Sequence, residues 1–178
     1  MNTRTITMAL LLIVPFAAQA QYTYLTNADN TITITSYNDT LSVESITNVI
    51  NGRTVAVVGA SAFSGKVKLS SVTIPNSVTN IGSQAFYNCT NLTSVTIGTN
   101  VVSIGSMAFD YCSALPRVTI PNSVTTIGTA AFLSCGGLTN AIIGANVTNI
   151  GQAAFGSACS SAPGSALRLT ISSRRAPV

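Results

Sequence analysis

The apolar positions of this chain recur at a fixed interval and do not follow the period of one helix or one strand. Residues 92–114 read LTSVTIGTNVVSIGSMAFDYCSA, and closely similar segments begin at Leu69, Leu115 and Leu138, each starting directly where the one before it ends. Within residues 92–114, successive apolar positions are separated by steps of 3, 2, 4, 3, 4 and 1, which fit neither a 3.6-residue nor a 2-residue period. A fixed interval of this length is typical of stacked repeats. The pattern therefore predicts a solenoid in which each coil packs on the next.

Each coil is expected to contain two short extended segments joined by corners. Val95 and Ile97 lie two residues apart and therefore point to the same face of a short strand. Gly98 turns the chain after this strand, where the neighbouring copies place proline. Residues 101–104 form the second extended side, and residues 106–109 are predicted to form a short helical turn that leads back.

Two residue types hold fixed slots and predict columns in the core. The phenylalanines are expected to stack as an aromatic column; they are Phe63, Phe86, Phe109, Phe132 and Phe155. The glycines indicate either a positive φ or a backbone approach too close for a side chain; they are Gly59, Gly82, Gly105, Gly128 and Gly151.

The four cysteines also follow the repeat. Cys89, Cys112 and Cys135 occupy the same slot in successive copies, and Cys159 stands one position later than that slot. The spacing favours a column of buried thiols that behave as small hydrophobic side chains. Coils about 4.8 Å apart would also permit one adjacent pair to form a disulfide.

The segments at the two ends depart from the regular copy. Residues 1–20 have the basic start, apolar run and Ala18-Gln19-Ala20 site of a secretory signal, so cleavage is expected after Ala20; the run is too short for a membrane anchor. Residues 21–45 predict a β-hairpin that caps the first coil, with a separate binding module as the alternative.

The solenoid itself is assigned to residues 46–171, with copies starting at 46, 69, 92, 115 and 138. The copy from residue 46 is degenerate because Asn51 stands where later copies place isoleucine. A partial copy from residue 166 follows an insertion near residues 160–164, with Leu169 and Ile171 as its strand pair, and residues 172–178 form a tail.

Composition excludes several functions. Only 7% of the residues are charged, which leaves no broad basic surface for nucleic acid. The chain has no histidine and no C-x-x-C motif, so neither a general acid–base set nor a zinc site is expected, and no cofactor is implied. Asp110 is expected on a solvated face, as most aspartates are. No segment after the signal is long and apolar enough to span a membrane.

A binding surface has more support than an active site. Outward-facing residues of the first strand of each coil would form a flat, hydroxyl-rich ribbon with one cation: Ser71, Thr73, Ser94, Thr96, Arg117, Thr119 and Asn140. Solenoids commonly bind partners through such an extended face. The same residues can instead serve only solubility and β propensity. An ordered threonine array facing ice or glycans is a third reading, which Ile142 interrupts.

The repeat L-x-x-V-x-I-P-x-x-V-x-x-I-G-x-x-A-F-x-x-C resembles the BspA-like leucine-rich-repeat family of bacterial surface proteins. The resemblance covers about residues 46–171, and Leu92, Val95, Ile97 and Asn100 match the L-x-x-L-x-L-x-x-N signature. It implies a short solenoid outside the cell or on its surface, non-enzymatic, with adhesion or recognition of a protein partner as its role. The alternative is a structural or glycan-facing solenoid without a specific protein partner.

Overall fold

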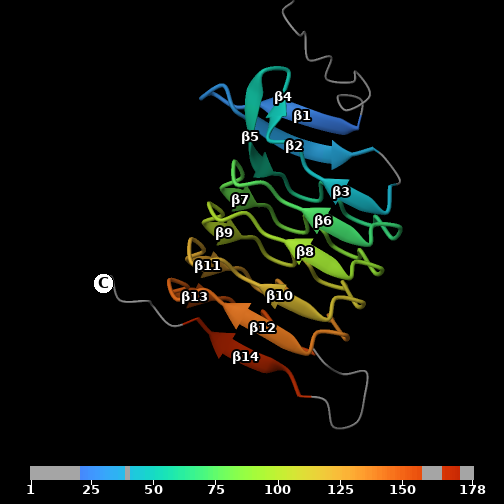
Figure 1. Cartoon of the computed structure of the whole chain (residues 1–178), viewed down its shortest axis with the longest axis vertical. Helices are drawn as coiled ribbons and strands as arrows, with labels where there is room; N and C mark the ends of the chain where they lie inside the picture. The colour runs from blue at the N-terminus through green and yellow to red at the C-terminus, as the bar shows by residue number, and fades with distance from the viewer. Residues whose placement is uncertain (1–20, 39–40, 158–165, 173–178) are drawn as a thin grey trace, which may run out of the picture.

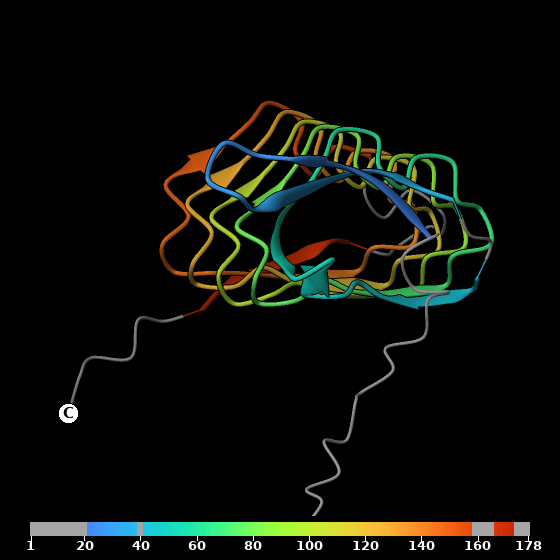
Figure 2. The same ribbon diagram turned by 90° about the horizontal axis from the view of Figure 1, so that it is seen from above.

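A computed structural model describes residues 21–38, 41–157 and 166–172. Within these ranges the chain winds into coils stacked along one axis, and the view from above shows each coil slightly displaced from the one before it (Figure 1, Figure 2). The predicted solenoid is therefore the observed fold. The predicted signal segment, Cys159 and most of the predicted tail lie outside the described residues.

An antiparallel hairpin covers the first coil, as predicted. Strand β1 (Tyr22–Thr26) pairs with β2 (Ile32–Tyr37), and β2 then pairs in parallel with β5 (Arg53–Val58). Between β1 and β2 the chain turns through Asn30, which has a φ of 65°. The inward side chains of the hairpin belong to the common core, so the hairpin is a cap and does not form a separate module.

One side of the solenoid is a continuous parallel sheet below this cap. After β5 it contains β7 (Asn80–Ile81), β9 (Ser103–Ile104), β11 (Thr126–Ile127) and β13 (Asn149–Ile150). From β7 onward, each strand pairs with the residues at the same slots of the next coil, for example Ile81 with Ile104. Strand β4 (Val49–Ile50) pairs with β5 in an antiparallel hairpin off this path.

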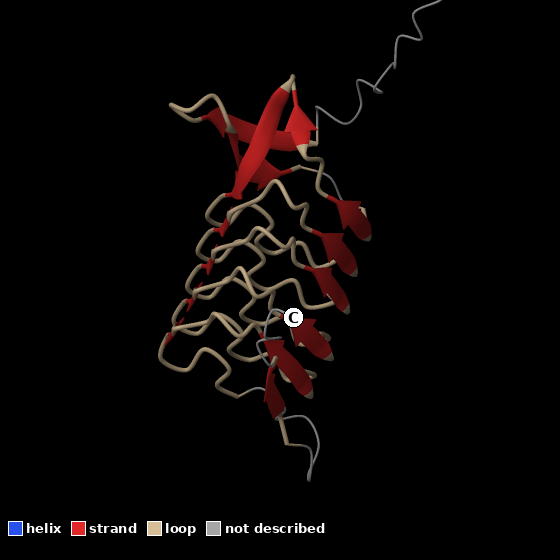
Figure 3. Ribbon diagram, turned by 60° about the vertical axis from the view of Figure 1, so that its left-hand side comes forward, coloured by secondary structure: helices blue, strands red, loops and turns tan. Residues whose placement is uncertain are grey.

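The other side carries two separate parallel sheets of three strands each. The first contains β3 (Val43–Ser45), β6 (Ser71–Thr73) and β8 (Ser94–Thr96). The second contains β10 (Arg117–Thr119), β12 (Asn140–Ile143) and β14 (Arg168–Ile171). Figure 3 shows the strands of both sheets along one side of the stack.

The first coil begins earlier than the sequence analysis placed it. Its strand is β3, in which Ser45 pairs with Thr73 of β6, so Ile46 occupies the isoleucine slot that had been assigned to Asn51. The extra residues of this coil enter the β4–β5 hairpin. At the other end, β14 also pairs at a longer offset than the regular interval, with Ile171 beside Ile143, as the insertion predicted.

A glutamate explains why the first strand escaped detection. Glu44 lies beside Val72 in the core-facing valine slot and is only 5% exposed. Its carboxylate accepts hydrogen bonds from the hydroxyls of Tyr22 and Tyr37, the latter at 2.9 Å. Burial, followed by the bond to Glu44, raises the pKa of Tyr22 and keeps that hydroxyl protonated as a donor.

The third side of each coil consists of tight turns, and the predicted helical turns are wrong. No helix occurs in the parts of the chain that the structure describes. Only every second residue forms an i→i+3 bond, such as Tyr87 N–H to Gln84 O at 3.0 Å, while the N–H between, such as that of Phe86, donates to the next coil. The left-handed φ values of Gln84 (58°) and Asn88 (57°) break the helical path, and later coils repeat both.

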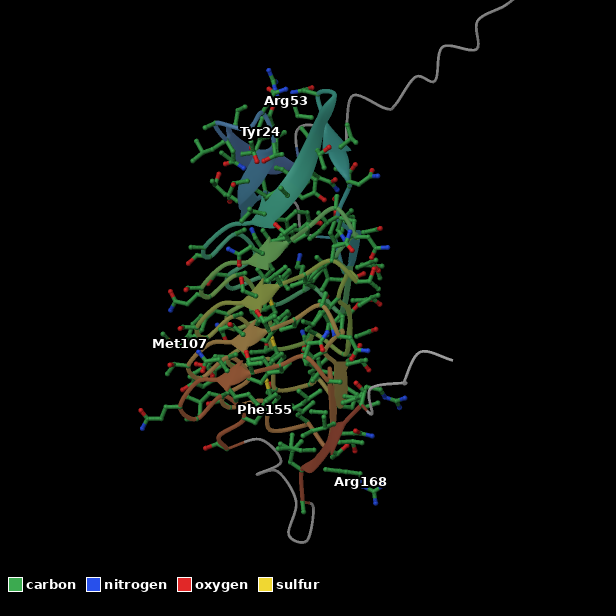
Figure 4. The ribbon with its side chains drawn as sticks, turned by 90° about the vertical axis from the view of Figure 1, so that its left-hand side faces the viewer. Tyr24, Arg53, Met107, Phe155 and Arg168 are labelled. Carbon is green, nitrogen blue, oxygen red and sulfur yellow. The ribbon has the colours of Figure 1, made fainter. Side chains whose placement is uncertain are left out.

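The phenylalanines form one stack through the core. Neighbouring ring centroids from Phe63 to Phe155 lie 4.9, 5.0, 5.1 and 5.2 Å apart, and all four pairs are stacked. Tyr37 of the cap stacks on Phe63 at 4.8 Å and closes the N-terminal end of the column. Phe155 is the last ring and lies towards the C-terminal end of the molecule (Figure 4).

The recurring glycine marks a close backbone approach and has no positive φ. A Cβ added at Gly128 would lie 2.5 Å from the backbone N of Ser106 and 2.6 Å from the carbonyl C of Gly105 in the preceding coil. Gly82, Gly105 and Gly151 meet their preceding coils in the same way, and Gly59 meets Ile34 of the cap. The close backbone approach, and not a positive φ, is therefore what requires glycine at these positions.

The three described cysteines are buried free thiols. The Sγ atoms of Cys89, Cys112 and Cys135 donate to the carbonyls of Phe63, Phe86 and Phe109, at 3.2, 3.3 and 3.1 Å. Burial raises the pKa of Cys89 and Cys135 to about 12 and that of Cys112 well above its ordinary value. These thiols are therefore packing groups and hydrogen-bond donors to the backbone.

Candidate functional site

The residues proposed as a binding ribbon lie together on the side formed by β6, β8, β10 and β12. We call this set the strand face; it comprises Ser71, Thr73, Ser94, Thr96, Arg117, Thr119 and Asn140. Ser71 is half-buried and the other six are exposed. Register places Ser71 beside Ser94 and Thr73 beside Thr96, while Arg117 lies beside Asn140. Arg117 is the one charged residue in the set.

The strand face is interrupted between β8 and β10. These strands belong to different sheets, and no backbone hydrogen bond joins them within the described ranges. At the equivalent steps, Ile74 N–H donates to Thr96 O at 2.9 Å and Ile120 N–H donates to Ile142 O at 2.8 Å. The corresponding bond from Ile97 to Thr119 is missing. The ribbon therefore consists of two separate halves.

Pro116 gives a chemical reason for the interruption. In neighbouring coils the residue at its slot donates its N–H to the coil before: Thr93 to Ser70 O at 2.8 Å, and Thr139 to Pro116 O at 3.0 Å. Proline has no N–H, so Pro116 can accept from Thr139 but cannot donate to Thr93. The hydrogen bond that Thr93 and Thr139 make from this slot is therefore impossible at Pro116.

A second contact between coils also skips this step. The side chain of Asn76 accepts from Thr99 N–H at 2.8 Å, and that of Asn122 accepts from Ala145 N–H at 2.9 Å. Only the copies with a Pro-Asn-Ser corner can make this bond to the coil that follows. The coil from residue 92 has Gly-Thr-Asn at its corner and makes no such bond to Asn122. Across this step Ser123 Oγ donates to Val101 O at 2.7 Å instead, so the two coils stay joined at the corner.

The interruption opens a cleft between the two halves of the strand face, which we call the inter-coil cleft. It contains two adjoining hollows of about 510 and 400 Å³. One is lined by Thr93, Ser94, Val95, Pro116, Arg117 and Thr119, and the other by Val95, Thr96, Ile97, Thr99, Thr119, Pro121, Asn122 and Ser123. Val95 is half-buried at the base, whereas its equivalents Val72 and Val118 are buried.

Sequence reasoning found the polar residues of this site but missed the cleft. The signals were present: Pro116 at a slot that elsewhere donates an N–H, and corners that alternate between Pro-Asn-Ser and Gly-Thr-Asn or Gly-Ala-Asn. Their meaning depends on which backbone groups face the neighbouring coil, and a single coil does not show this.

Asp110 lies in the core, which corrects the expectation that it is solvated. It is 3% exposed, and its Oδ1 has no hydrogen-bond partner among the described residues. Burial raises its pKa above the ordinary value, while the Tyr111 backbone and the Ser134 hydroxyl lower it to a smaller extent. The equivalent residue of the next coil is Leu133, which is half-buried, so the slot accepts an apolar side chain.

We expect Asp110→Leu to raise the free energy of unfolding at pH 7 by about 1–2 kcal/mol, because it removes a poorly satisfied buried carboxylate. A raised folded-state pKa means that the native state binds the proton more tightly than the unfolded chain does. The destabilisation by Asp110 is therefore complete at neutral pH and is relieved as pH falls toward the ordinary pKa, about 3.9.

Chemical denaturation of both proteins at pH 7 and pH 4 measures the difference, which should shrink at pH 4. Asp29→Asn is the control, since the exposed Asp29 carboxylate accepts a hydrogen bond from the Thr31 hydroxyl at 2.7 Å. That variant should gain no stability. An Asp110→Leu protein less stable than wild type at pH 7 would contradict the assigned burial.

No other cluster in the described residues suggests chemistry. No three His, Cys, Asp or Glu side chains gather there in a way that could hold a metal ion. In the same ranges, no helix reaches the length and hydropathy of a membrane span. The inter-coil cleft with the strand face is therefore the candidate site.

The sequence profile described as the BspA type leucine rich repeat region matches residues 30–162 in six copies. The chain belongs to this family. The BspA-type repeat accounts for the coil observed here, with the leucine, valine and isoleucine slots facing the core and the recurring phenylalanine in the column. No match is found among curated proteins.

Solved bacterial leucine-rich-repeat proteins share the fold. The leucine-rich-repeat protein TpLRR of T. pallidum is 33% identical with a TM-score of 0.75, and the match covers 76% of this chain and 64% of that one. A leucine-rich-repeat protein of Bacteroides ovatus is 31% identical with a TM-score of 0.67, over 74% of this chain and 36% of that one. The chain thus spans less than two thirds of either relative.

A third relative is described as a cell-surface protein. This leucine-rich protein of Faecalibacterium prausnitzii is 31% identical with a TM-score of 0.54, over 86% of this chain and 54% of that one. The family match and these structural neighbours are thus all leucine-rich-repeat proteins, and the neighbours are bacterial.

Proposed function

We propose that this protein is exported and acts outside the bacterial cell as a non-enzymatic recognition or adhesion module that binds a protein partner through the strand face. The observation that carries the proposal is the set of six exposed polar side chains, held in register by the strands beneath them. A rigid face of this kind needs little ordering when it binds. Export is supported by the signal-like residues 1–20 and by the surface location stated for the Faecalibacterium relative.

The alternative is a structural or glycan-facing solenoid without a specific protein partner. A lattice-like threonine array would need unbroken rows of identical spacing. Thr73 lies beside Thr96 in one sheet. Thr119 belongs to the other sheet, where it lies beside Ile142. The interruption between β8 and β10 therefore counts against a regular array and in favour of a shaped recognition site.

The function is tested by measuring binding of the chain from Gln21 onward to purified extracellular-matrix proteins and, separately, to a glycan array. We expect saturable binding to at least one matrix protein, weakened about tenfold by Arg117→Ser, since a charge at an interface contributes on this scale. Lys68→Ser is the matched control because Lys68 is exposed but lies outside the strand face. Its affinity should stay within about twofold of wild type.

Each other outcome has a defined meaning. Binding to glycans alone would favour the alternative, and no saturable binding to either class would favour a purely structural role. Equal losses in the Arg117→Ser and Lys68→Ser proteins would show that net charge, and not the strand face, governs the interaction.

A further inference from the structure

The strand face ends at β12, but the sheet beneath it continues into β14. In the register of this sheet Arg117 lies beside Asn140, and Asn140 lies beside Arg168. All three residues are exposed, and the Arg168 side chain points away from the body of the solenoid (Figure 4). We call these three residues the basic row. Because neighbouring strands lie about 4.8 Å apart, the backbone positions of the two arginines are about 10 Å apart, with the amide between them.

Backbone hydrogen bonds fix β14 against β12 at both of its ends. Arg168 N–H donates to Thr139 O at 3.0 Å, and Ser172 N–H donates to Ile143 O at 2.8 Å. The positions from which the side chains of the basic row project are therefore set before any partner binds, which lowers the cost of ordering on binding.

The acidic residues that the structure describes all lie away from the basic row. Asp29 follows β1 in the turn to β2, Glu44 is buried beneath the cap, and Asp110 is buried in the core. Among the described residues, no carboxylate therefore neutralises the two guanidiniums. A guanidinium presents a planar set of donors that matches a carboxylate, so the row suits an acidic group on each side of Asn140.

A second row of outward side chains runs beside the basic row, two residues further along each strand. It consists of Thr119, Ile142 and Thr170, which are also exposed and in register. Of the six outward residues in these two rows only Ile142 is apolar, and it is 37% exposed. An apolar contact surrounded by polar and charged ones is the usual arrangement in a protein interface. The position of Ile142 therefore favours a protein segment over an acidic polysaccharide as the ligand.

We infer that the sheet of β10, β12 and β14 binds a segment of the protein partner that presents two acidic side chains about 10 Å apart with an apolar side chain between them. Each carboxylate pairs with one guanidinium of the basic row, and the apolar side chain packs on Ile142. This inference rests on the proposed function and adds Arg168 as a second charged contact of the same surface. The β6–β8 half, with Ser71, Thr73, Ser94 and Thr96, carries no charge and does not select for acidic groups.

A helical segment supplies the required spacing. At 1.5 Å per residue, acidic side chains at positions i and i+7 of a helix lie about 10.5 Å apart on one face, and residue i+4 lies between them. In an extended segment, residues that share a face are about 6.7 or about 13 Å apart, and neither distance matches the basic row.

The inference is tested with an alanine-based helical peptide that carries glutamate at i and i+7 and leucine at i+4. The control peptide has the same composition but places the second glutamate at i+9, on the opposite face of the helix. Nuclear magnetic resonance titration of the chain from Gln21 should show saturable shifts of the backbone amides of β10, β12 and β14 with the first peptide. The control peptide should bind at least about fivefold more weakly, because it can engage only one arginine.

A double variant, Arg117→Ser with Arg168→Ser, should lower the affinity for the i, i+7 peptide at least about fivefold. The matched control is Arg174→Ser with Arg175→Ser, which removes the same net charge from residues that follow the sheet in the sequence. Its affinity should stay within about twofold of wild type. An equal loss in the two double variants would overturn the inference, because net charge and not the basic row would then govern binding. Equal binding of the two peptides, or no saturable binding of the first, would also overturn it.

The two proposals fail in distinguishable ways. If a matrix protein loses affinity with Arg117→Ser but not with Arg168→Ser, and the i, i+7 peptide does not saturate, the proposed function stands and this inference is wrong. If no matrix protein binds but the peptide binds through both arginines, the inference is supported and the choice of matrix proteins as partners is wrong. Binding of hyaluronan through both arginines, without binding of the peptide, would assign the row to an acidic polysaccharide and overturn the inference.

Discussion

Replacing Phe109 by alanine is expected to lower the free energy of unfolding by about 3–5 kcal/mol, the usual cost of truncating a buried phenylalanine. Phe109 is fully buried and stacks on Phe86 and Phe132, with ring centroids 5.0 and 5.1 Å away. Its removal leaves a cavity in the middle of the column. The rigid coils above and below cannot collapse into it, because their backbones are held by the parallel ladder.

Urea denaturation followed by circular dichroism measures this loss. Phe155→Ala is the matched control: its ring is half-buried and has one stacked neighbour, Phe132, at 5.2 Å. The control should lose about half as much stability or less, because less of its surface is removed from water. A Phe109→Ala protein with the same denaturation midpoint as wild type would be incompatible with the column.

Gly128→Ala is expected to destabilise the protein by about 3 kcal/mol, at the upper end of the usual cost of overpacking. The added methyl group would lie within 2.9 Å of three backbone atoms of Gly105 and Ser106 in the preceding coil. Backbone atoms held in a parallel ladder cannot move aside as a flexible side chain can, so the coils would have to separate locally.

The control for this second substitution is Gly156→Ala. There the nearest atom to an added Cβ is the end of the flexible Leu133 side chain, at 2.9 Å. Thermal unfolding should show a small shift for this variant and a large one for Gly128→Ala. Similar shifts for both would mean that backbone contact between the coils is not what requires glycine at residue 128.

The repeat could be recognised from the sequence because several copies carry the same pattern. Errors at single positions do not hide an interval that several copies share, and the interval fixes which residues stack. The aromatic column and the strand register follow directly from it. The C-terminal insertion was also readable, since Leu169 and Ile171 preserve the strand pattern after it.

What could not be read depends on partners from other coils. Glu44 in a valine slot resembles a solvated residue until the hydroxyls of Tyr22 and Tyr37 are placed beside it. Asp110 was assigned to the surface from its residue type, although neighbouring coils cover it. A short helical turn was expected at Ser106-Met107-Ala108-Phe109 and its equivalents, whereas the positive φ values at Gln84 and Asn88 appear only in the folded coil.

The residues of the strand face could be predicted from the sequence, because side chains alternate between the two faces of a strand and the buried positions were already assigned. The cleft was not found, because it results from the N–H that Pro116 lacks and from corner bonds that alternate between copies. Both effects concern the space between two coils and leave the pattern within each coil unchanged.

The missing bonds between β8 and β10 also bear on how this molecule comes apart. In repeat proteins, total stability is close to a sum of contributions from each unit and each junction between neighbours. The junction after the coil from residue 92 keeps the phenylalanine stack and the β9–β11 pairing but has lost its ladder on one side. Among the described junctions of the array it is the one without strand pairing on this side, so we expect the two groups of coils to separate there first when the protein unfolds.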